Sequence, residues 1–418
     1  MLRAVLVCLI GVSVTNAGEE ASPNWPRFRG PSGDGHSVEK SLPTEWDANS
    51  VEWKVTLPVT GQSSPIIWGE HIFLTGTTGS ADSVKRHVLC LDRRTQKLVW
   101  NKSVAKGDGE KLHKMNTWAT PSCVTDGEVV VAFFGPGGLH CFDFEGELLW
   151  SRQLGDFPGA WGVGASPVIH GDLVIQNCDA QGTSYLLAVN RKTGKDVWKT
   201  PRRSTPRGGW STPVLIENKD RQVLVLNGEF GVQGYDPATG KDLWFCKSFN
   251  GRGAPSPVFG HGLVYVVNGK PGDVYAVKPG GTGDVTDTHM AWHAPRGGGR
   301  DLPSPILQNN CVVVLGMQAI ATGYDATTGK QLWKSRLGGN YSASPIAANG
   351  LVYAAAEDGT VSVLKVGEKC EVVAKNRLGT SSDETFRSSM AVSDGQLFLR
   401  STKSLYCVGS RATKVAAK

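Results

Sequence analysis

The chain has 418 residues, a formal net charge of +6 and a pI of about 8.8. Its 52 glycines and 22 prolines amount to about 18% of the residues, below the roughly 25–30% typical of disordered low-complexity chains. Composition therefore excludes a mainly disordered protein. Charges of both signs are interspersed, so they give no indication of nucleic-acid binding.

The N-terminus has the pattern of a secretory signal peptide. Arg3 precedes an apolar run over residues 4–14, and the small residues that signal peptidase reads follow, ending at Ala17. We expect cleavage near Ala17 and a periplasmic or secreted protein without a transmembrane segment. Cys8 lies early in the apolar run behind a bulky residue, which disfavours a lipid anchor.

A Ser-Pro or Thr-Pro pair followed by an apolar strand recurs every 40 to 56 residues, at Ser64, Thr120, Ser166, Thr212, Ser256, Ser304 and Ser344, with a degenerate copy at Ser389. Two further apolar strands follow each pair. The second of them often ends in Asp, with Gly a few residues later, as at Asp236 and Gly240. Asp and Gly in this order are typical of hairpin turns.

The fourth strand of each unit carries a tryptophan, at Trp53, Trp100, Trp150, Trp198, Trp244, Trp292 and Trp333, while Ala374 occupies the eighth such position. Four short antiparallel strands in units of about 45 residues are the signature of β-propeller blades. We predict that these tryptophans are structural and pack between blades.

The two ends of the chain contribute complementary parts of one blade. The strand over residues 51–57 is the fourth strand of a blade, but the three strands that should precede it are missing. The last unit, residues 390–408, has three strands and lacks the fourth. Joining them closes the ring and removes exposed edges. The sequence thus predicts an all-β, eight-bladed propeller over residues 51–410. It follows a signal peptide (1–17) and an N-terminal extension (18–50), and it precedes a basic tail (411–418).

Eight cysteines remain after Cys8, without any CxxC motif or adjacent pair. Cys90, Cys141 and Cys407 stand at a register where other repeats have Ala or Gly. This pattern predicts small buried residues, and it leaves any disulfide pairing open.

The tryptophan strand, the turn over residues 236–241 and the Ser-Pro opening resemble the pyrroloquinoline-quinone-type propeller repeat. Quinoprotein alcohol dehydrogenases and the BamB propellers of outer-membrane assembly share this repeat. The segment over residues 24–35 is similar to a leader found in many secreted bacterial members. The resemblance covers residues 24 to about 409 and implies the fold. It does not imply one function, because this repeat occurs in enzymes and in non-enzymes.

Residues just before each strand opening should form a ring at one mouth of the central channel. They are Gln62, Trp118, Trp161, Trp210, Arg252, Arg300, Asp301, Tyr341 and Arg387, and the long crossing between Trp100 and Pro121 adds His113. Aromatic and Arg side chains stack on planar or sugar ligands, hold anions or anchor a peptide. Alternatively, the aromatics fill a narrow channel and the Arg side chains cap strand ends.

We find no catalytic or metal-binding motif. The quinoproteins that the repeat resembles carry an adjacent Cys-Cys pair, a calcium site and a catalytic Asp, none of which matches a motif here. Our leading hypothesis is a monomeric, non-catalytic scaffold of the cell envelope that binds a protein or peptide. The alternatives are a dehydrogenase of alcohols or sugars that uses pyrroloquinoline quinone with calcium, and a carbohydrate-binding propeller.

Overall fold

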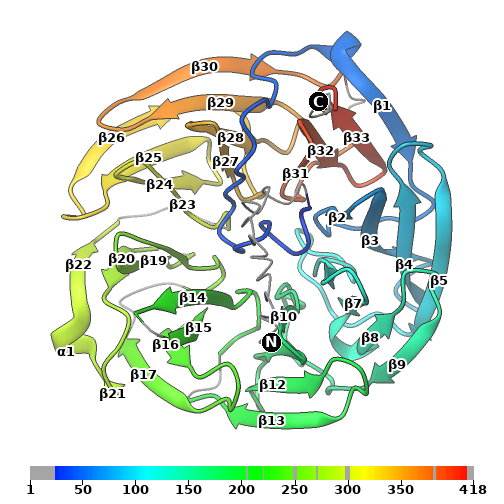
Figure 1. Ribbon diagram of the computed structural model, residues 1–418, viewed down its shortest axis with the longest axis horizontal. Helices are drawn as coiled ribbons and strands as arrows, with labels where there is room; N and C mark the ends of the chain where they lie inside the picture. Colours follow the sequence, from blue (N-terminus) through cyan, green and yellow to red (C-terminus); the bar gives the residue numbers. More distant parts are fainter. Residues whose placement is uncertain are drawn as a thin grey trace, which may run out of the picture.

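A computed structural model describes residues 24–203, 206–219, 221–247, 252–269, 272–296, 302–379 and 383–411. Eight antiparallel sheets are arranged as blades around a central axis (Figure 1). The prediction of an all-β, eight-bladed propeller is confirmed. The described residues contain only one short helix, α1 (Thr286–His289), and two 3-10 turns, η1 (Ala48–Ser50) and η2 (Gly135–Gly137). None of the described helices is long and apolar enough to cross a bilayer.

The strands of each blade run outward from the axis. Blades 1 to 4 consist of β2 (Ile66–Trp68), β3 (His71–Thr78), β4 (Val84–Asp92), β5 (Leu98–Gly107); β6 (Val124–Thr125), β7 (Val130–Phe133), β8 (Leu139–Phe142), β9 (Leu148–Arg152); β10 (Val168–His170), β11 (Leu173–Cys178), β12 (Tyr185–Asn190), β13 (Asp196–Pro201); and β14 (Val214–Asn218), β15 (Arg221–Asn227), β16 (Gly231–Tyr235), β17 (Asp242–Lys247). A short fifth strand, β21 (Gly283–Asp284), adds to blade 4 in parallel with β17.

Blades 5 to 8 repeat the same order. They consist of β18 (Val258–Gly260), β19 (Leu263–Val267), β20 (Val274–Val277), β22 (Met290–Ala294); β23 (Ile306–Gln308), β24 (Cys311–Gly316), β25 (Ile320–Asp325), β26 (Gln331–Arg336); β27 (Ile346–Ala348), β28 (Leu351–Ala355), β29 (Val361–Val366), β30 (Cys370–Asn376); and β31 (Ala391–Ser393), β32 (Gln396–Arg400), β33 (Ser404–Val408), β1 (Val51–Thr56).

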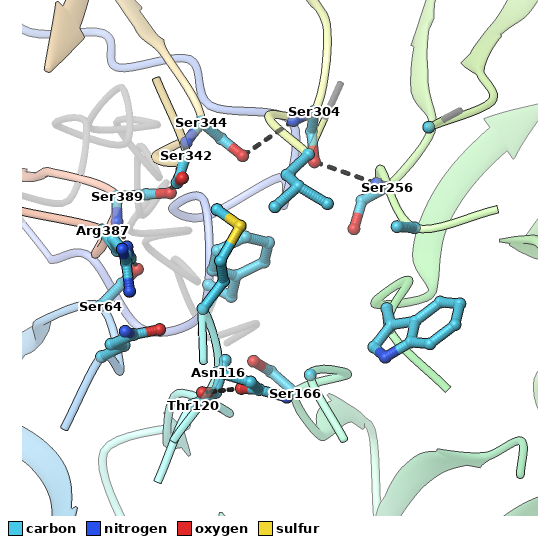
Figure 2. A pocket seen from close by; sticks show the side chains of 18 of the residues that line it. Ser64, Asn116, Thr120, Ser166, Ser256, Ser304, Ser342, Ser344, Arg387 and Ser389 are labelled. Carbon is cyan, nitrogen blue, oxygen red and sulfur yellow. Dashed lines mark hydrogen bonds between the residues drawn. The ribbon is translucent and has the colours of Figure 1, made fainter. Parts of the chain in front are cut away.

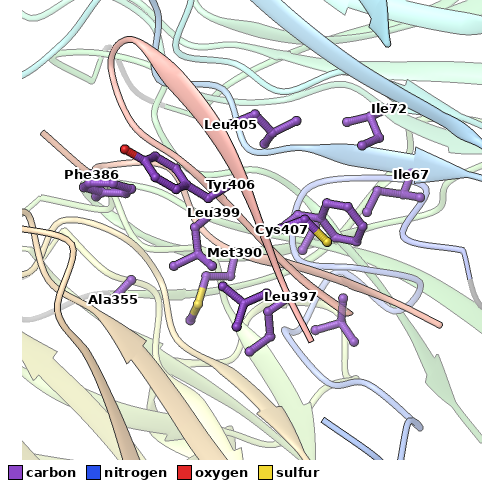
Figure 3. Close-up of a cluster of buried hydrophobic side chains, with 14 of the residues drawn as sticks. Ile67, Ile72, Ala355, Phe386, Met390, Leu397, Leu399, Leu405, Tyr406 and Cys407 are labelled. Carbon is purple, nitrogen blue, oxygen red and sulfur yellow. The ribbon is translucent and has the colours of Figure 1, made fainter. Parts of the chain in front are cut away.

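The ring closes as the sequence predicts. Strand β1 pairs antiparallel with β33, so blade 8 combines both ends of the propeller. Figure 3 shows the core of this closure, where Leu397, Leu405 and Cys407 of blade 8 belong to one buried cluster with Ile67 and Ile72 of blade 1. Joining the two ends through a core and a strand ladder leaves no exposed blade edge at the seam.

The turns between the two outer strands of a blade contact the neighbouring blade. The Asp236 carboxylate accepts backbone N–H groups of residues 238 and 239, and Gly240 then takes φ +71°. A Cβ atom on Gly240 would lie 2.4 Å from the ring of Trp198 in the preceding blade. The indole of Trp198 also donates to the Pro237 carbonyl. The turn glycine therefore permits both the left-handed backbone and close packing against tryptophan.

The same indole contact recurs around the ring. Trp100, Trp150, Trp292 and Trp333 each donate Nε1–H to a carbonyl of the following blade, at 2.7–2.9 Å. Buried indole N–H groups need such a partner, so one side chain supplies both apolar area and a directional bond across each of these seams.

The N-terminal extension crosses the axis, as the dark blue chain in Figure 1 shows. We call residues 24–37 the axial strap. Trp25 exchanges two backbone hydrogen bonds with Ile67 of blade 1, and Ser37 donates to Ala347 of blade 7. Between them, the buried Arg29 donates Nη2 to the Pro305 carbonyl of blade 6 at 2.7 Å. The strap therefore ties together blades on different sides of the ring. The predicted signal peptide and residues 412–418 lie outside the described residues.

All cysteines from Cys90 onward are free thiols, and only Cys370 is not fully buried. Burial raises the pKa of the Cys123 and Cys141 thiols to about 12, so almost no thiolate is present at neutral pH. We expect iodoacetamide at pH 8 to modify Cys370 first in the native protein, and every cysteine after denaturation in guanidinium. Mass spectrometry of the labelled peptides measures both. Rapid native labelling of Cys123 would contradict this assignment.

Candidate functional site

An axial cavity of about 280 Å³ lies at the centre of the ring. Six of the residues predicted from the sequence line it, namely Gln62, His113, Trp161, Trp210, Arg252 and Arg387. Phe28 of the axial strap also lines it. The strap forms its backbone hydrogen bonds with Ile67 and Ala347, each of which lies three residues after the opening serine of its blade. Three residues of extended chain span about 10 Å, so the strap lies about that far from the serines along the strands. The cavity thus has the predicted residues at its mouth and the strap at its inner end.

A closed ring of hydrogen bonds surrounds this cavity. In every blade the residue two positions before the innermost strand donates its backbone N–H to the side-chain hydroxyl of its counterpart in the next blade, at 2.8–3.1 Å. The eight members, which we call the hydroxyl ring, are Ser64, Ser122, Ser166, Thr212, Ser256, Ser304, Ser344 and Ser389. Figure 2 shows two of these bonds, from Ser256 to Ser304 and from Ser304 to Ser344.

The hydroxyl ring shows that the predicted start of blade 2 is two residues too early. In blade 2 its member is Ser122, followed by Cys123, and not Thr120 of the Thr120-Pro121 pair. Thr120 instead bonds within its own loop, to Asn116 and Thr117. The Ser-Pro signal misleads here because blade 2 has Cys where most blades have Pro. Proline suits this buried position since it has no N–H that would need a partner.

The long crossing between blades 1 and 2 folds over the mouth. Its Asn116 side chain donates to the carbonyl groups of Trp161 and Val163 in the next crossing, at 2.7 and 3.1 Å. At the other end of the crossing, Glu110 forms an ion pair with the buried Arg86. These contacts hold the part of the crossing that carries His113, so the length of the loop is used to build the site.

Trp161 forms the aromatic centre of the mouth. Its ring centroid lies 4.5 Å from that of His113, and the Arg252 guanidinium carbon lies 4.2 Å from the Trp161 ring. A cation at this distance is attracted to the π-face of an indole. The half-buried Trp210 is fixed by its Nε1–H, which donates to the Gly162 carbonyl beside Trp161 at 2.9 Å. Two tryptophans from adjacent crossings are thus held in defined orientations.

Arg387 lies on the opposite part of the mouth. Its guanidinium forms an ion pair with Glu357, with Nε 3.1 Å from Oε1, and Nη1 reaches the Lys114 carbonyl of the long crossing at 3.4 Å. Ser342 also bonds Glu357. The arginine is therefore oriented toward the cavity that it lines, as Figure 2 shows.

Two of the described predicted site residues, Trp118 and Tyr341, are not among those that line the cavity. Trp118 packs over Gly109 and donates its indole N–H to the Glu110 carbonyl, which stabilises the long crossing. Tyr341 is 1% exposed, and its hydroxyl lies 3.3 Å from Ser362. Arg300 and Asp301 lie outside the described residues.

The described lining of the cavity is a poor match for a calcium site. Calcium prefers several carboxylate and carbonyl oxygen ligands, whereas the described residues that line the cavity include no Asp or Glu. Across the described part of the chain, no three His, Cys, Asp or Glu side chains gather closely enough to hold a metal ion. The described lining offers hydroxyls, amides and arginines, which suit an anion.

A family model described as outer membrane protein assembly factor BamB matches residues 42–215, 160–286 and 270–369. BamB of Burkholderia pseudomallei is 35% identical over 287 residues, covering 65% of each chain. Methanol dehydrogenase subunit 1 of Methylorubrum extorquens is 25% identical over 167 residues, 34% of this chain and 27% of that protein. Tetrathionate hydrolase of Acidithiobacillus ferrooxidans is 25% identical over 205 residues, 45% of this chain and 38% of that protein. The chain thus spans less than two thirds of each relative.

The fold recurs in solved structures, among them a BamB propeller and a methanol dehydrogenase. BamB from Moraxella catarrhalis superposes with a TM-score of 0.59 at 14% identity, covering 86% of this chain and 99% of that one. A europium-containing methanol dehydrogenase superposes with a TM-score of 0.69 at 11% identity, covering 94% of this chain and 99% of that one. An assembly factor and a dehydrogenase therefore share this architecture, so the fold alone does not decide the function.

Proposed function

Because the chain belongs to the BamB family of pyrroloquinoline-quinone-type repeat propellers, we propose that it is a non-catalytic binding protein of the cell envelope. In this proposal the protein is exported by its N-terminal signal peptide. The open mouth of the propeller binds a segment of a protein partner. The seven tryptophans on the outer strands act as docking residues between blades and take no part in binding.

One observation carries the proposal. The axial cavity has the strap at one end, and its mouth is lined by two oriented tryptophans and two arginines, without a carboxylate among the described lining residues. Aromatic and Arg side chains in a desolvated pocket are the residue types that contribute most to protein recognition. Calcium binding would require carboxylates that the described lining does not supply.

Site-specific photocrosslinking in the native host tests the proposal. A benzoylphenylalanine at Met317, which lines the cavity, should form discrete protein adducts. The same probe at Val197, which is 50% exposed on the outer strand β13, should form none. We expect Trp161→Ala to reduce the Met317 adducts at least fivefold, because the mouth then loses its aromatic centre. Equal adducts at both positions, or none at Met317, would contradict binding at the mouth.

A parallel measurement addresses the enzymatic alternative. The purified protein is incubated with pyrroloquinoline quinone and calcium, and then assayed for a bound chromophore and for dye-linked oxidation of alcohols or sugars. We expect neither. A bound chromophore with turnover would replace the proposed function by a quinoprotein dehydrogenase, whereas a glycan that binds and competes with the Met317 adducts would favour carbohydrate recognition.

A further inference from the structure

The hydroxyl ring has hydrogen-bonding capacity that the fold does not use. Each of its eight hydroxyl oxygens accepts one backbone N–H from the preceding blade, and none of the hydroxyls donates to a described residue. The ring members are 1–6% exposed. A hydroxyl that already accepts a hydrogen bond is polarised toward donating its own proton. The ring therefore offers up to eight O–H donors around the axis.

The neighbouring hydroxyls behave differently. Ser211, which directly precedes the ring member Thr212, donates to the Pro255 carbonyl, and Ser388, which precedes Ser389, donates to the Gln62 carbonyl. These two hydroxyls serve the backbone. Apart from Thr212, all members of the ring line the cavity, whereas Ser211 and Ser388 do not. Seven of the ring hydroxyls, each with an unused O–H donor, thus line the cavity, whereas those of Ser211 and Ser388 donate to backbone carbonyls.

The charge around the ring favours an anion. Arg252 and Arg387 line the same cavity, and its described lining contains no Asp or Glu. Arg387 pairs with Glu357, and the Arg252 guanidinium lies against the Trp161 ring. Hydroxyl donors and guanidinium groups in a site with restricted water access stabilise a negative charge more strongly than they would in water.

The dimensions favour the end or a side chain of a peptide. A cavity of about 280 Å³ lies at the lower limit of the roughly 300–1,000 Å³ typical of small-molecule sites. The tryptophans lie at its mouth, where they can pack against the apolar part of an entering chain. Seven members of the hydroxyl ring and Phe28 of the strap line the same cavity as these tryptophans.

We propose that the hydroxyl ring is a carboxylate-binding site, which receives a C-terminal or side-chain carboxylate of a peptide that enters between Trp161 and Trp210. This inference rests on the proposed function and specifies the chemistry of the partner. The carboxylate accepts O–H bonds from ring members, and the arginines of the mouth balance its charge.

Three probe peptides test the inference and separate the two sources of carboxylate. They are acetyl-Ala-Phe with a free C-terminus, acetyl-Asp-Phe-amide, and the neutral acetyl-Ala-Phe-amide. Each is titrated into protein labelled with 5-fluorotryptophan, with the Trp161 and Trp210 fluorine resonances assigned by Trp→Phe variants. We expect at least one carboxylate peptide to bind tenfold more tightly than the neutral peptide, and the tighter of the two identifies the source.

Three variants of the full chain show whether the ring is responsible. Ser256→Ala removes one O–H donor at the cavity. We expect it to lower the affinity for the carboxylate peptide at least threefold and to leave the affinity for the neutral peptide unchanged. Ser256→Thr keeps the hydroxyl and should keep the preference. Ser211→Ala, a matched control outside the ring, should have no effect. Unfolding curves establish that each variant is folded.

Equal affinities for charged and neutral peptides, or an unchanged preference in Ser256→Ala, would overturn the inference. Failure of all three peptides to bind would overturn it as well. The Met317 adducts remain an independent measurement, so a carboxylate site can fail while binding at the mouth stands.

Discussion

Replacing Trp150 by alanine is expected to lower the free energy of unfolding by about 3–5 kcal/mol. Its side chain is only 9% exposed, and its indole donates to the Arg191 carbonyl of the next blade at 2.7 Å. A Cβ atom on Gly194 would lie 2.8 Å from the ring, so this turn packs tightly on the indole. The substitution would therefore leave a cavity at the seam between blades 2 and 3 and remove the indole hydrogen bond across it.

Chemical denaturation measures this loss, and Trp150→Phe serves as the matched control. Phenylalanine keeps most of the buried apolar area and loses the indole hydrogen bond, so we expect it to cost about 1–2 kcal/mol. A loss below 1 kcal/mol for the alanine variant would show that the seam does not depend on the indole. Equal losses for both variants would show that the apolar area which phenylalanine retains contributes nothing.

The fold could be predicted from the sequence because its determinants are local and repeated. Trp198 and Gly240 lie at fixed positions in consecutive repeats, and the structure brings them into contact across a seam. The single strand over residues 51–57 and the three-stranded unit over residues 390–408 predicted closure for the same reason, since an unpaired edge must find a partner.

The site was predicted less completely, because position before a strand does not determine where a side chain points. Tyr341 stands at the predicted mouth, yet its ring is buried in the core of blades 6 and 7. Trp118 likewise packs on its own loop. The hydroxyl ring left a signal in the recurrent Ser or Thr, but that signal also fits a simple strand opening. The strap had no pattern that could place Phe28 in the channel.

Removing the carboxylate of Asp179 is expected to have an effect of similar size to the loss of Trp150. Asp179 and Arg202 form a buried ion pair, with side chains 3% and 5% exposed and Nε 2.9 Å from Oδ1. Arg202 also bonds the Tyr235 hydroxyl of blade 4. Asp179→Ala would leave a guanidinium charge buried without its partner, which typically costs about 3–5 kcal/mol.

This pair also supports the mouth. Gly209, which immediately precedes Trp210, packs against the Asp179 backbone, and a Cβ atom on Gly209 would lie 2.6 Å from the Asp179 carbonyl oxygen. The Gly209 carbonyl also accepts a hydrogen bond from the Gly164 N–H. We therefore expect Asp179→Ala to shift the fluorine resonance of Trp210 as well as to lower the denaturation midpoint. Gly164 itself lines the cavity, so a displaced Gly209 would reach the site directly.

The double variant Asp179→Leu/Arg202→Met separates the charge from the packing. It removes both charges and retains apolar volume, so it should be less destabilised than Asp179→Ala alone, as is common when a buried ion pair is replaced as a unit. If the double variant loses as much as the sum of the single Asp179→Leu and Arg202→Met losses, the two residues act independently. In that case the stability of this seam would come from apolar packing, and Trp210 would be held by its Gly162 bond alone.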